Sequence, residues 1–197
     1  MKTHWLLLAA FAGVLLLNSS AFTAEEKEEA KFECKCVVSG QPAKEDKFTE
    51  VHGKKVYFCC DNCPKAFAKD PEKFTAKVHH QWAKTAQIVQ VACPFSGEAL
   101  DPEQSIEVDG VKVAFCCENC KGKAEKDADA LALIFADIEE GFTLQNLCPV
   151  SGKPILADKV VEHEGKKVYF CCDNCPKAFA KDPSKFLSKL PQFAEQK

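Results

Sequence analysis

The sequence predicts a small α+β protein, built from three tandem ββαα-like units that follow an export signal. Two observations carry this prediction: a cysteine pattern that recurs three times, and a short apolar segment at the amino terminus. The chain has 197 residues, of which 46% are hydrophobic and 28% charged, a composition typical of globular proteins. Its unusual feature is 13 Cys against one Met, so an account of its function must place the cysteines.

The amino terminus has the pattern of a secretory signal. Residues 5–17 form an uninterrupted apolar run of 13 residues, shorter than a membrane-spanning helix requires. Small side chains at Ser19 and Ala21 predict cleavage after residue 21. We therefore expect a signal peptide over 1–21, a charged leader over 22–31, and an exported mature chain that is periplasmic or secreted. Once cleaved, such a chain is not an integral membrane protein.

Three repeats follow, over 32–81 (repeat 1), 88–140 (repeat 2) and 144–193 (repeat 3). Each opens with a cysteine followed by Ser-Gly and has the pattern C-x22-C-C-x2-C, with starts 57 and 55 residues apart (93 − 36 and 148 − 93). Residues 53–71 and 165–183 are identical. The repeated cysteines are Cys36, Cys59, Cys60 and Cys63, then Cys93, Cys116, Cys117 and Cys120, then Cys148, Cys171, Cys172 and Cys175. Cys34 lies outside this pattern.

Local signals predict the same elements in each repeat. A turn at Ser-Gly precedes two short strands, in repeat 1 over 47–51 and 55–59, which the pair His52-Gly53 joins as a hairpin. Asp61 or Asn62 is expected to cap a first helix, and Asp70-Pro71 starts a second. A unit of about 50 residues buries little apolar surface, so we expect each unit to need a staple.

The cysteine spacing makes metal the first candidate for that staple. Cys59 and Cys63 lie at a strand-to-helix junction, four residues apart, and Cys36 approaches from the turn. Three converging thiolates suit soft ions, Zn²⁺ or Cu⁺, with up to one ion per repeat. Cys60 is either a fourth ligand or a buried core thiol. Metal-stapled units of this kind would be treble-clef-like or zinc-ribbon-like.

No histidine recurs with the cysteines. His52 and His163 have unrelated residues at the aligned positions of the other repeats, and His79 and His80 lie near the end of a predicted helix. We therefore expect them at the surface or at helix ends rather than at a shared metal site.

The run Tyr57-Phe-Cys59, then Cys63 and Phe67, then Asp70-Pro71, resembles the YHS and TRASH heavy-metal-binding domains. Repeat 3 has the same run, and repeat 2 a weaker version with Ala114 in place of the tyrosine. The resemblance implies that three cysteines per repeat bind copper, zinc or related ions. These would be Cys36, Cys59 and Cys63, then Cys93, Cys116 and Cys120, then Cys148, Cys171 and Cys175, with Cys60, Cys117 and Cys172 as additional thiols.

Composition and context leave two alternatives to a metal-binding protein. Because an exported chain tolerates disulfides, the cysteines could instead staple a scaffold for protein interaction. The C-x-x-C pairs also allow a thiol–disulfide oxidoreductase, although the expected βαβ context is missing and we predict no enzyme activity. A net charge of −3 without arginine argues against a nucleic-acid partner, whereas a protein partner for the lysine-rich surface stays open.

Overall fold

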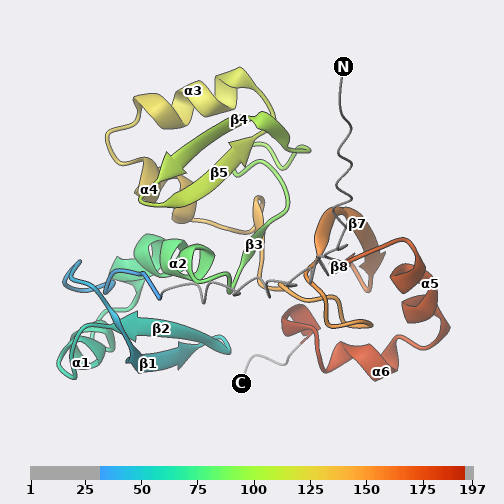
Figure 1. The fold of residues 1–197 in the computed structure, drawn as a ribbon, viewed down its shortest axis with the longest axis horizontal. Helices are drawn as coiled ribbons and strands as arrows, with labels where there is room; N and C mark the ends of the chain where they lie inside the picture. Colours follow the sequence, from blue (N-terminus) through green and yellow to red (C-terminus); the bar gives the residue numbers. More distant parts are fainter. Residues whose placement is uncertain (1–31, 194–197) are drawn as a thin grey trace, which may run out of the picture. The chain divides into compact units, whose positions relative to one another are not determined.

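The computed structural model describes residues 32–193, so the predicted signal peptide and the charged leader both lie outside the described residues. The described part is a small mixed α and β structure with four two-stranded sheets (Figure 1). Three of these sheets are the hairpins of the repeats. Between residues 32 and 193, no helix combines the length and apolar character needed to span a membrane.

Each repeat contains the predicted hairpin. The pairs are β1 (Lys44–Val51) with β2 (Lys54–Phe58), β4 (Asp101–Val108) with β5 (Val111–Phe115), and β7 (Leu156–His163) with β8 (Lys166–Phe170). Both turn residues have positive φ in every hairpin, for example 49° at His52 and 71° at Gly53. Such two-residue turns match the twist of the strands they join, which is why an x-Gly pair recurs there.

The helices follow the hairpins as predicted, with different lengths in the three repeats. Repeat 1 has α1 (Cys63–Phe67), the 3-10 turn η1 (Glu72–Phe74) and α2 (Thr75–Lys84). Repeat 2 has α3 (Glu118–Lys126) and α4 (Ala130–Phe135), and repeat 3 has α5 (Asn174–Lys181), α6 (Ser184–Leu187) and the 3-10 turn η2 (Pro191–Phe193). Asn62 holds the N-cap position of α1, but its side chain makes no capping hydrogen bond.

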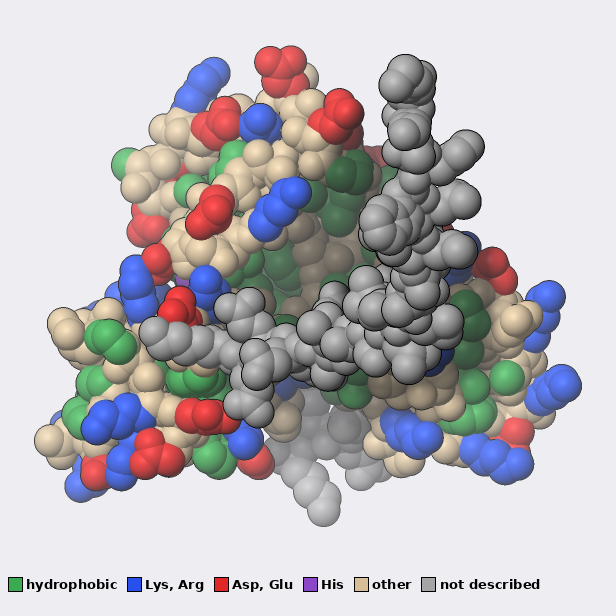
Figure 2. Space-filling model, in the orientation of Figure 1, with side chains coloured by type: hydrophobic (Ala, Val, Ile, Leu, Met, Phe, Trp, Pro, Cys, Tyr) green, Lys and Arg blue, Asp and Glu red, His purple; other side chains and the backbone are tan. Residues whose placement is uncertain are grey.

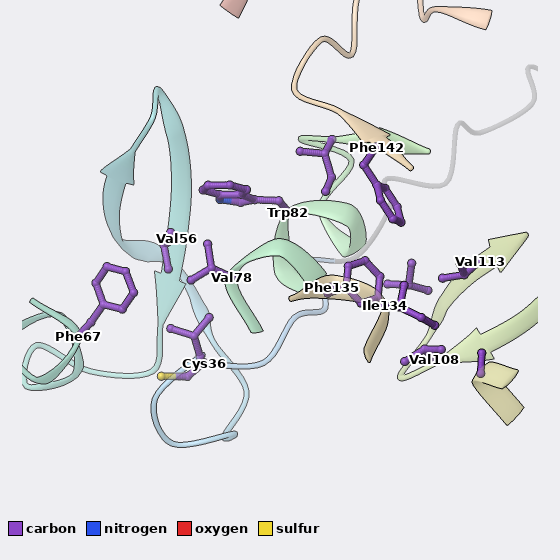
Figure 3. Packing of buried hydrophobic residues seen from close by; sticks show 14 of the residues in the cluster. Cys36, Val56, Phe67, Val78, Trp82, Val108, Val113, Ile134, Phe135 and Phe142 are labelled. Atoms are coloured by element: carbon purple, nitrogen blue, oxygen red, sulfur yellow. The ribbon is translucent and has the colours of Figure 1, made fainter. Parts of the chain in front are cut away.

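Repeats 1 and 2 share one hydrophobic core, built around α2. Figure 3 shows Val78 and Trp82 of α2 on the side of the β1–β2 hairpin, with Phe135 and Ile134 of α4 beyond the helix. Trp82 is 2% exposed and Phe135 is fully buried. A helix that buries apolar surface on two sides joins the two repeats into one packed body.

The histidines of α2 differ from the expectation of surface or helix-end positions. His80 is buried, and its Nε2 lies 3.0 Å from the carbonyl oxygen of Val108. His79 is half-buried, and its Nδ1 lies 2.8 Å from the carbonyl oxygen of Phe135. Both rings are covered because repeat 2 packs against this face of α2, where their nitrogens satisfy carbonyl groups of the neighbouring repeat.

Repeat 3 has a core of its own, which includes Phe170, Phe179 and Leu190. A two-stranded sheet links the start of repeat 2 to the segment that precedes repeat 3, pairing β3 (Val89–Gln90) with β6 (Phe142–Thr143). Val89 and Val91 pack against the core of repeat 3. Because repeat 3 buries its central side chains separately, we expect its unfolding to be distinguishable from that of repeats 1 and 2.

Lysine and acidic side chains are interspersed on the visible face of the molecule (Figure 2). Several ion pairs join them, such as Lys35 with Asp109 and Lys121 with Glu125. This mixture agrees with the small net charge of −3. Exposed pairs of this kind contribute about 0–1 kcal/mol each, so they support solubility more than stability.

Candidate metal centre

Each repeat brings three cysteines together in one group, which we call its triad. Within each triad the sulfur atoms all lie within 4.8 Å of one another. The triads are Cys36, Cys59 and Cys63 in repeat 1, Cys93, Cys116 and Cys120 in repeat 2, and Cys148, Cys171 and Cys175 in repeat 3. The convergence predicted from the spacing is therefore present in all three repeats, with no histidine in any triad.

The spacing of the sulfurs suits a soft ion. Cys59 Sγ and Cys63 Sγ are 3.6 Å apart, and the corresponding pairs of repeats 2 and 3 are each separated by 3.7 Å. Zinc–thiolate bonds of about 2.3 Å place two tetrahedral ligands about 3.8 Å apart. The second and third thiols therefore lie at the separation that one bound ion would require, with the first within 4.8 Å of both, and their sulfur chemistry matches Zn²⁺ or Cu⁺.

Different backbone elements deliver the members of a triad. Cys36 opens a tight turn, closed by a 2.8 Å hydrogen bond from the Gly40 amide to the Cys36 carbonyl. Gly40 has φ of 72°, a left-handed conformation that favours glycine, and Gly97 and Gly152 repeat it. Cys59 directly follows strand β2, and Cys63 is the first residue of α1. Turn, strand end and helix start thus meet at one point.

The first cysteine of each triad lies in a setting that favours its thiolate. Burial disfavours the charge on Cys36, but hydrogen bonds from the Ser39 hydroxyl and from neighbouring backbone amides outweigh burial and lower its pKa to about 7. The pKa values of Cys93 and Cys148 are lowered to about 7 by the same balance. A thiol that ionises near neutral pH has its proton displaced by an incoming cation at little cost in free energy.

The third cysteine of each triad behaves in the opposite way. Burial, with additional effects of the neighbouring thiols, raises the pKa of Cys120 and of Cys175 to about 12, and it raises the pKa of Cys63 as well. The first and third cysteines of a triad are thus shifted in opposite directions, one towards the thiolate and one towards the neutral thiol. Binding of an ion would displace the remaining protons.

A serine contacts every triad, a feature that the cysteine pattern did not identify. Ser39 Oγ lies 3.2 Å from Cys59 Sγ, Ser96 Oγ lies 3.3 Å from Cys116 Sγ, and Ser151 Oγ lies 3.1 Å from Cys171 Sγ. These serines are exposed, so the triads open towards solvent on this side. The recurrence of serine three residues after the first cysteine is the sequence signal that could have found them.

The fourth cysteine of each repeat lies beside the triad. Cys60 is exposed, so it is not a buried core thiol, and its Sγ lies 3.6 Å from Cys63 Sγ. Cys172 Sγ lies 3.5 Å from Cys175 Sγ, whereas Cys117 Sγ lies 3.6 Å from Cys116 Sγ. Backbone amides, those of Asn62 and Cys63, lower the pKa of Cys60. Each fourth thiol thus has its closest sulfur contact with one triad member, the third cysteine in repeats 1 and 3 and the second in repeat 2.

Cys34, the cysteine outside the repeated pattern, is buried and belongs to no triad. Burial raises its pKa to about 11, which disfavours the reactive thiolate. All thirteen cysteines are free, and even the closest pair of sulfurs in a repeat, at 3.5 Å, is well beyond the bond length of about 2.05 Å in a disulfide.

A glutamine amide joins the two ligand-bearing segments in each repeat. Gln145 Oε1 accepts a hydrogen bond of 3.0 Å from the Tyr169 amide, and its Nε2 donates to the carbonyls of Leu147 at 3.0 Å and Tyr169 at 2.6 Å. Leu147 precedes the first cysteine of the triad, and Tyr169 stands two residues before the second. The amide group of this side chain therefore pairs with backbone groups as a neighbouring strand would, and it aligns both segments.

The other repeats use the same arrangement from two sources. Gln90, which stands where Gln145 does relative to the first cysteine, bonds in the same way to Ala92 and Ala114. Repeat 1 has Glu33 at that position, and Gln81 of α2 supplies the amide instead, bonding to Lys35 and Tyr57. Gln81 is distant along the chain from the aligned position, so alignment of the repeats does not point to it, whereas the recurrence of Gln90 and Gln145 three residues before the first cysteine is a sequence signal.

Replacement of Gln145 by leucine tests this role. The Gln145→Leu change leaves the buried Tyr169 amide and two carbonyls without partners, so we expect the free energy of unfolding of repeat 3 to fall by about 1–3 kcal/mol. Hydrogen exchange of the backbone amides, resolved by repeat, measures the change. Gln41→Leu, at an exposed position, is the matched control. Equal effects of the two substitutions would contradict the role of Gln145.

Comparison of the chain with protein-family models, with curated proteins and with solved structures gave no match. The triads and their surroundings therefore carry the functional argument.

Proposed function

We propose that the protein is an exported, non-catalytic metal-binding protein that holds one soft ion, Zn²⁺ or Cu⁺, at each cysteine triad. Storage, delivery, sensing and structural stapling are the roles open to such a protein. The observation that carries the proposal is the threefold recurrence of three thiols within 4.8 Å of one another. The resemblance of the repeats to YHS and TRASH domains supports the same reading.

The surrounding residues give the three cysteines of each triad different roles in binding an ion. The first cysteine, whose ionisation is favoured by amides and a serine hydroxyl, would attract the cation, and the other two would complete the ligand set. Ser39, Ser96 and Ser151 would then orient the second cysteine through their hydrogen bonds. A bound ion would also tie the turn, the strand end and the helix start of a small unit together.

The disulfide-stapled scaffold remains the competing proposal, because the same thiols are close enough to react after modest movement. It requires the adjacent cysteines of each repeat to take different partners. A metal-binding protein, by contrast, keeps all its thiols reduced around the ions.

Metal analysis together with a thiol count separates the two proposals. We purify the chain without added metal, measure bound zinc and copper, and titrate free thiols after denaturation in a chelator. We expect up to three ions per chain, one for each triad, and close to all 13 thiols in reduced form. A chain that has about one free thiol, and that takes up no zinc or copper when offered either, would contradict metal binding and favour the disulfide scaffold.

A further inference from the structure

The fourth cysteines have no place in the triads, yet two of them lie against a buried ligand. We propose that Cys60 and Cys172 form thiol–disulfide exchange sites, which oxidise Cys63 and Cys175 and release the ion from triads 1 and 3 but not from triad 2. The substrate would be a low-molecular-weight disulfide such as glutathione disulfide. Release of the ion rests on the proposed metal-binding function, whereas formation of the disulfide does not.

The geometry of repeats 1 and 3 favours this reaction. Cys60 is exposed and Cys63 is buried, and their sulfurs are 3.6 Å apart; Cys172 and Cys175 are 3.5 Å apart. The Cys63 amide donates to the Cys60 carbonyl at 3.3 Å, and the Cys175 amide donates to the Cys172 carbonyl at the same distance. A tight turn therefore presents an accessible thiol next to a thiol that is a triad member.

Repeat 2 lacks this turn, and the sequence explains the difference. Lys121 donates its amide to the Cys117 carbonyl at 3.1 Å, so α3 already begins at Glu118 with Cys117 as an extended N-cap. Proline occupies the matching positions, Pro64 and Pro176, and cannot make this bond because it has no N–H. The fourth thiol of repeat 2 consequently contacts Cys116, its neighbour in the chain.

An ion pair contacts the turn in the same two repeats. Lys47 Nζ lies 2.7 Å from Asp61 Oδ1, and Lys159 Nζ lies 2.9 Å from Asp173 Oδ1. Both aspartates immediately follow the fourth cysteine. Repeat 2 has Gln104 and Glu118 at the aligned positions, so it has no counterpart of this pair.

A disulfide between the two adjacent cysteines of repeat 2 is disfavoured on geometric grounds. Consecutive Cα atoms across a trans peptide are about 3.8 Å apart, whereas disulfides require about 4.4–6.8 Å. Cys117 has the same C-x-x-C spacing to Cys120 as Cys60 has to Cys63, but its closest sulfur contact is with Cys116, whereas that of Cys60 is with Cys63. We therefore expect exchange to be confined to repeats 1 and 3.

The exchange is balanced with the disulfide as oxidant. The Cys60 thiolate attacks one sulfur of glutathione disulfide, breaking its S–S bond and releasing one glutathione thiolate. The Cys63 thiolate then attacks the Cys60 sulfur of this mixed disulfide and releases the second glutathione. Two cysteine sulfurs lose two electrons, the oxidant gains them, and the released thiolates take protons from the cysteines or from solvent. The triad keeps two thiolates, and the ion leaves.

The test uses the full chain loaded with Zn²⁺, an ion that does not itself change oxidation state. We add excess glutathione disulfide without oxygen and follow zinc release with a coloured chelator. Of the three ions expected from the three triads, two should leave. The Cys60→Ser, Cys172→Ser double variant should retain all three, Cys117→Ser should behave as the parent, and Lys121→Pro should make the third ion releasable.

Mass spectrometry of the digested protein identifies the new bond. Residues 56–65 and 168–177 give identical tryptic peptides with three cysteines each, so the single variants Cys60→Ser and Cys172→Ser assign the repeats. We expect Cys60 joined to Cys63 and Cys172 joined to Cys175. Bonds within the triads, or parent-like zinc release from the double variant, would overturn the inference, as would release of all three ions at one rate.

The metal-free, reduced chain keeps this test separate from the proposed function. If the chain takes up neither zinc nor copper, the proposed function fails, and the same mapping on the metal-free chain still reports whether Cys60 pairs with Cys63. If zinc binds and these bonds do not form, the exchange site alone is contradicted.

Discussion

Replacement of Cys148 by serine is expected to abolish tight metal binding in repeat 3 and to leave two of the three ions on the chain. Cys148 is 1% exposed and is the triad member whose thiolate the surrounding amides favour. Serine keeps the size of the side chain but removes the soft sulfur donor. Because loss of an outer-shell partner already weakens a metal site about 10–100-fold, loss of this ligand should weaken it by more than about 100-fold.

Cys34→Ser is the matched control, since it alters a buried cysteine outside the triads. We expect this variant to retain all three ions and the parent affinity at each of them. Competition with a chelator of known affinity measures both numbers. Three ions bound to Cys148→Ser at unchanged affinity, or a lost ion in Cys34→Ser, would show that the triads are not the binding sites.

Replacement of Phe135 by alanine is expected to destabilise repeats 1 and 2 together, by about 3–5 kcal/mol. Phe135 is fully buried, with its ring centroid 5.2 Å from that of His80 and 5.3 Å from that of Phe142. It belongs to the core that contains side chains of both repeats. The cavity left by alanine therefore affects α2 and α4 at once.

Phe170→Ala makes the same change in the separate core of repeat 3. Hydrogen exchange resolved by repeat should show lost protection in repeats 1 and 2 for Phe135→Ala, and in repeat 3 alone for Phe170→Ala. Loss of protection confined to repeat 2 in the first variant would mean that repeats 1 and 2 fold independently. Equal loss in all three repeats would contradict a separate core in repeat 3.

The local parts of each repeat were predictable because short-range chemistry controls them. A Ser-Gly pair needs glycine at positive φ, and the x-Gly pair at residues 52–53 suits a two-residue hairpin. The spacing of Cys36, Cys59 and Cys63 then brings turn, strand end and helix start together. The side-chain capping by Asp61 or Asn62 did not follow, since the N-cap Asn62 makes no side-chain bond to the helix.

The role of the fourth cysteine was undecided for a different reason. In an extended strand Cys60 would point with Phe58, but the chain has already turned beyond β2, and Cys60 is exposed. Whether this thiol contacts the third or the second cysteine depends on where the helix begins. Lys121 has a backbone N–H that bonds to the Cys117 carbonyl, whereas Pro64 has none. The effect of this difference on the turn is visible only in the structure.

Cysteine spacing and turn residues thus settled the number of repeats, their hairpins and the membership of the triads, since each depends on contacts within about 50 residues. The packing between repeats was beyond the reach of such patterns. His79 and His80 have the polar character of a solvent-facing helix side, and only the arrival of repeat 2 gives their ring nitrogens the carbonyls of Phe135 and Val108. Tertiary packing also decides that Gln81, and not the residue at the aligned position, Glu33, supplies the amide in repeat 1. A hydrogen bond needs its partner nearby in space and not along the chain.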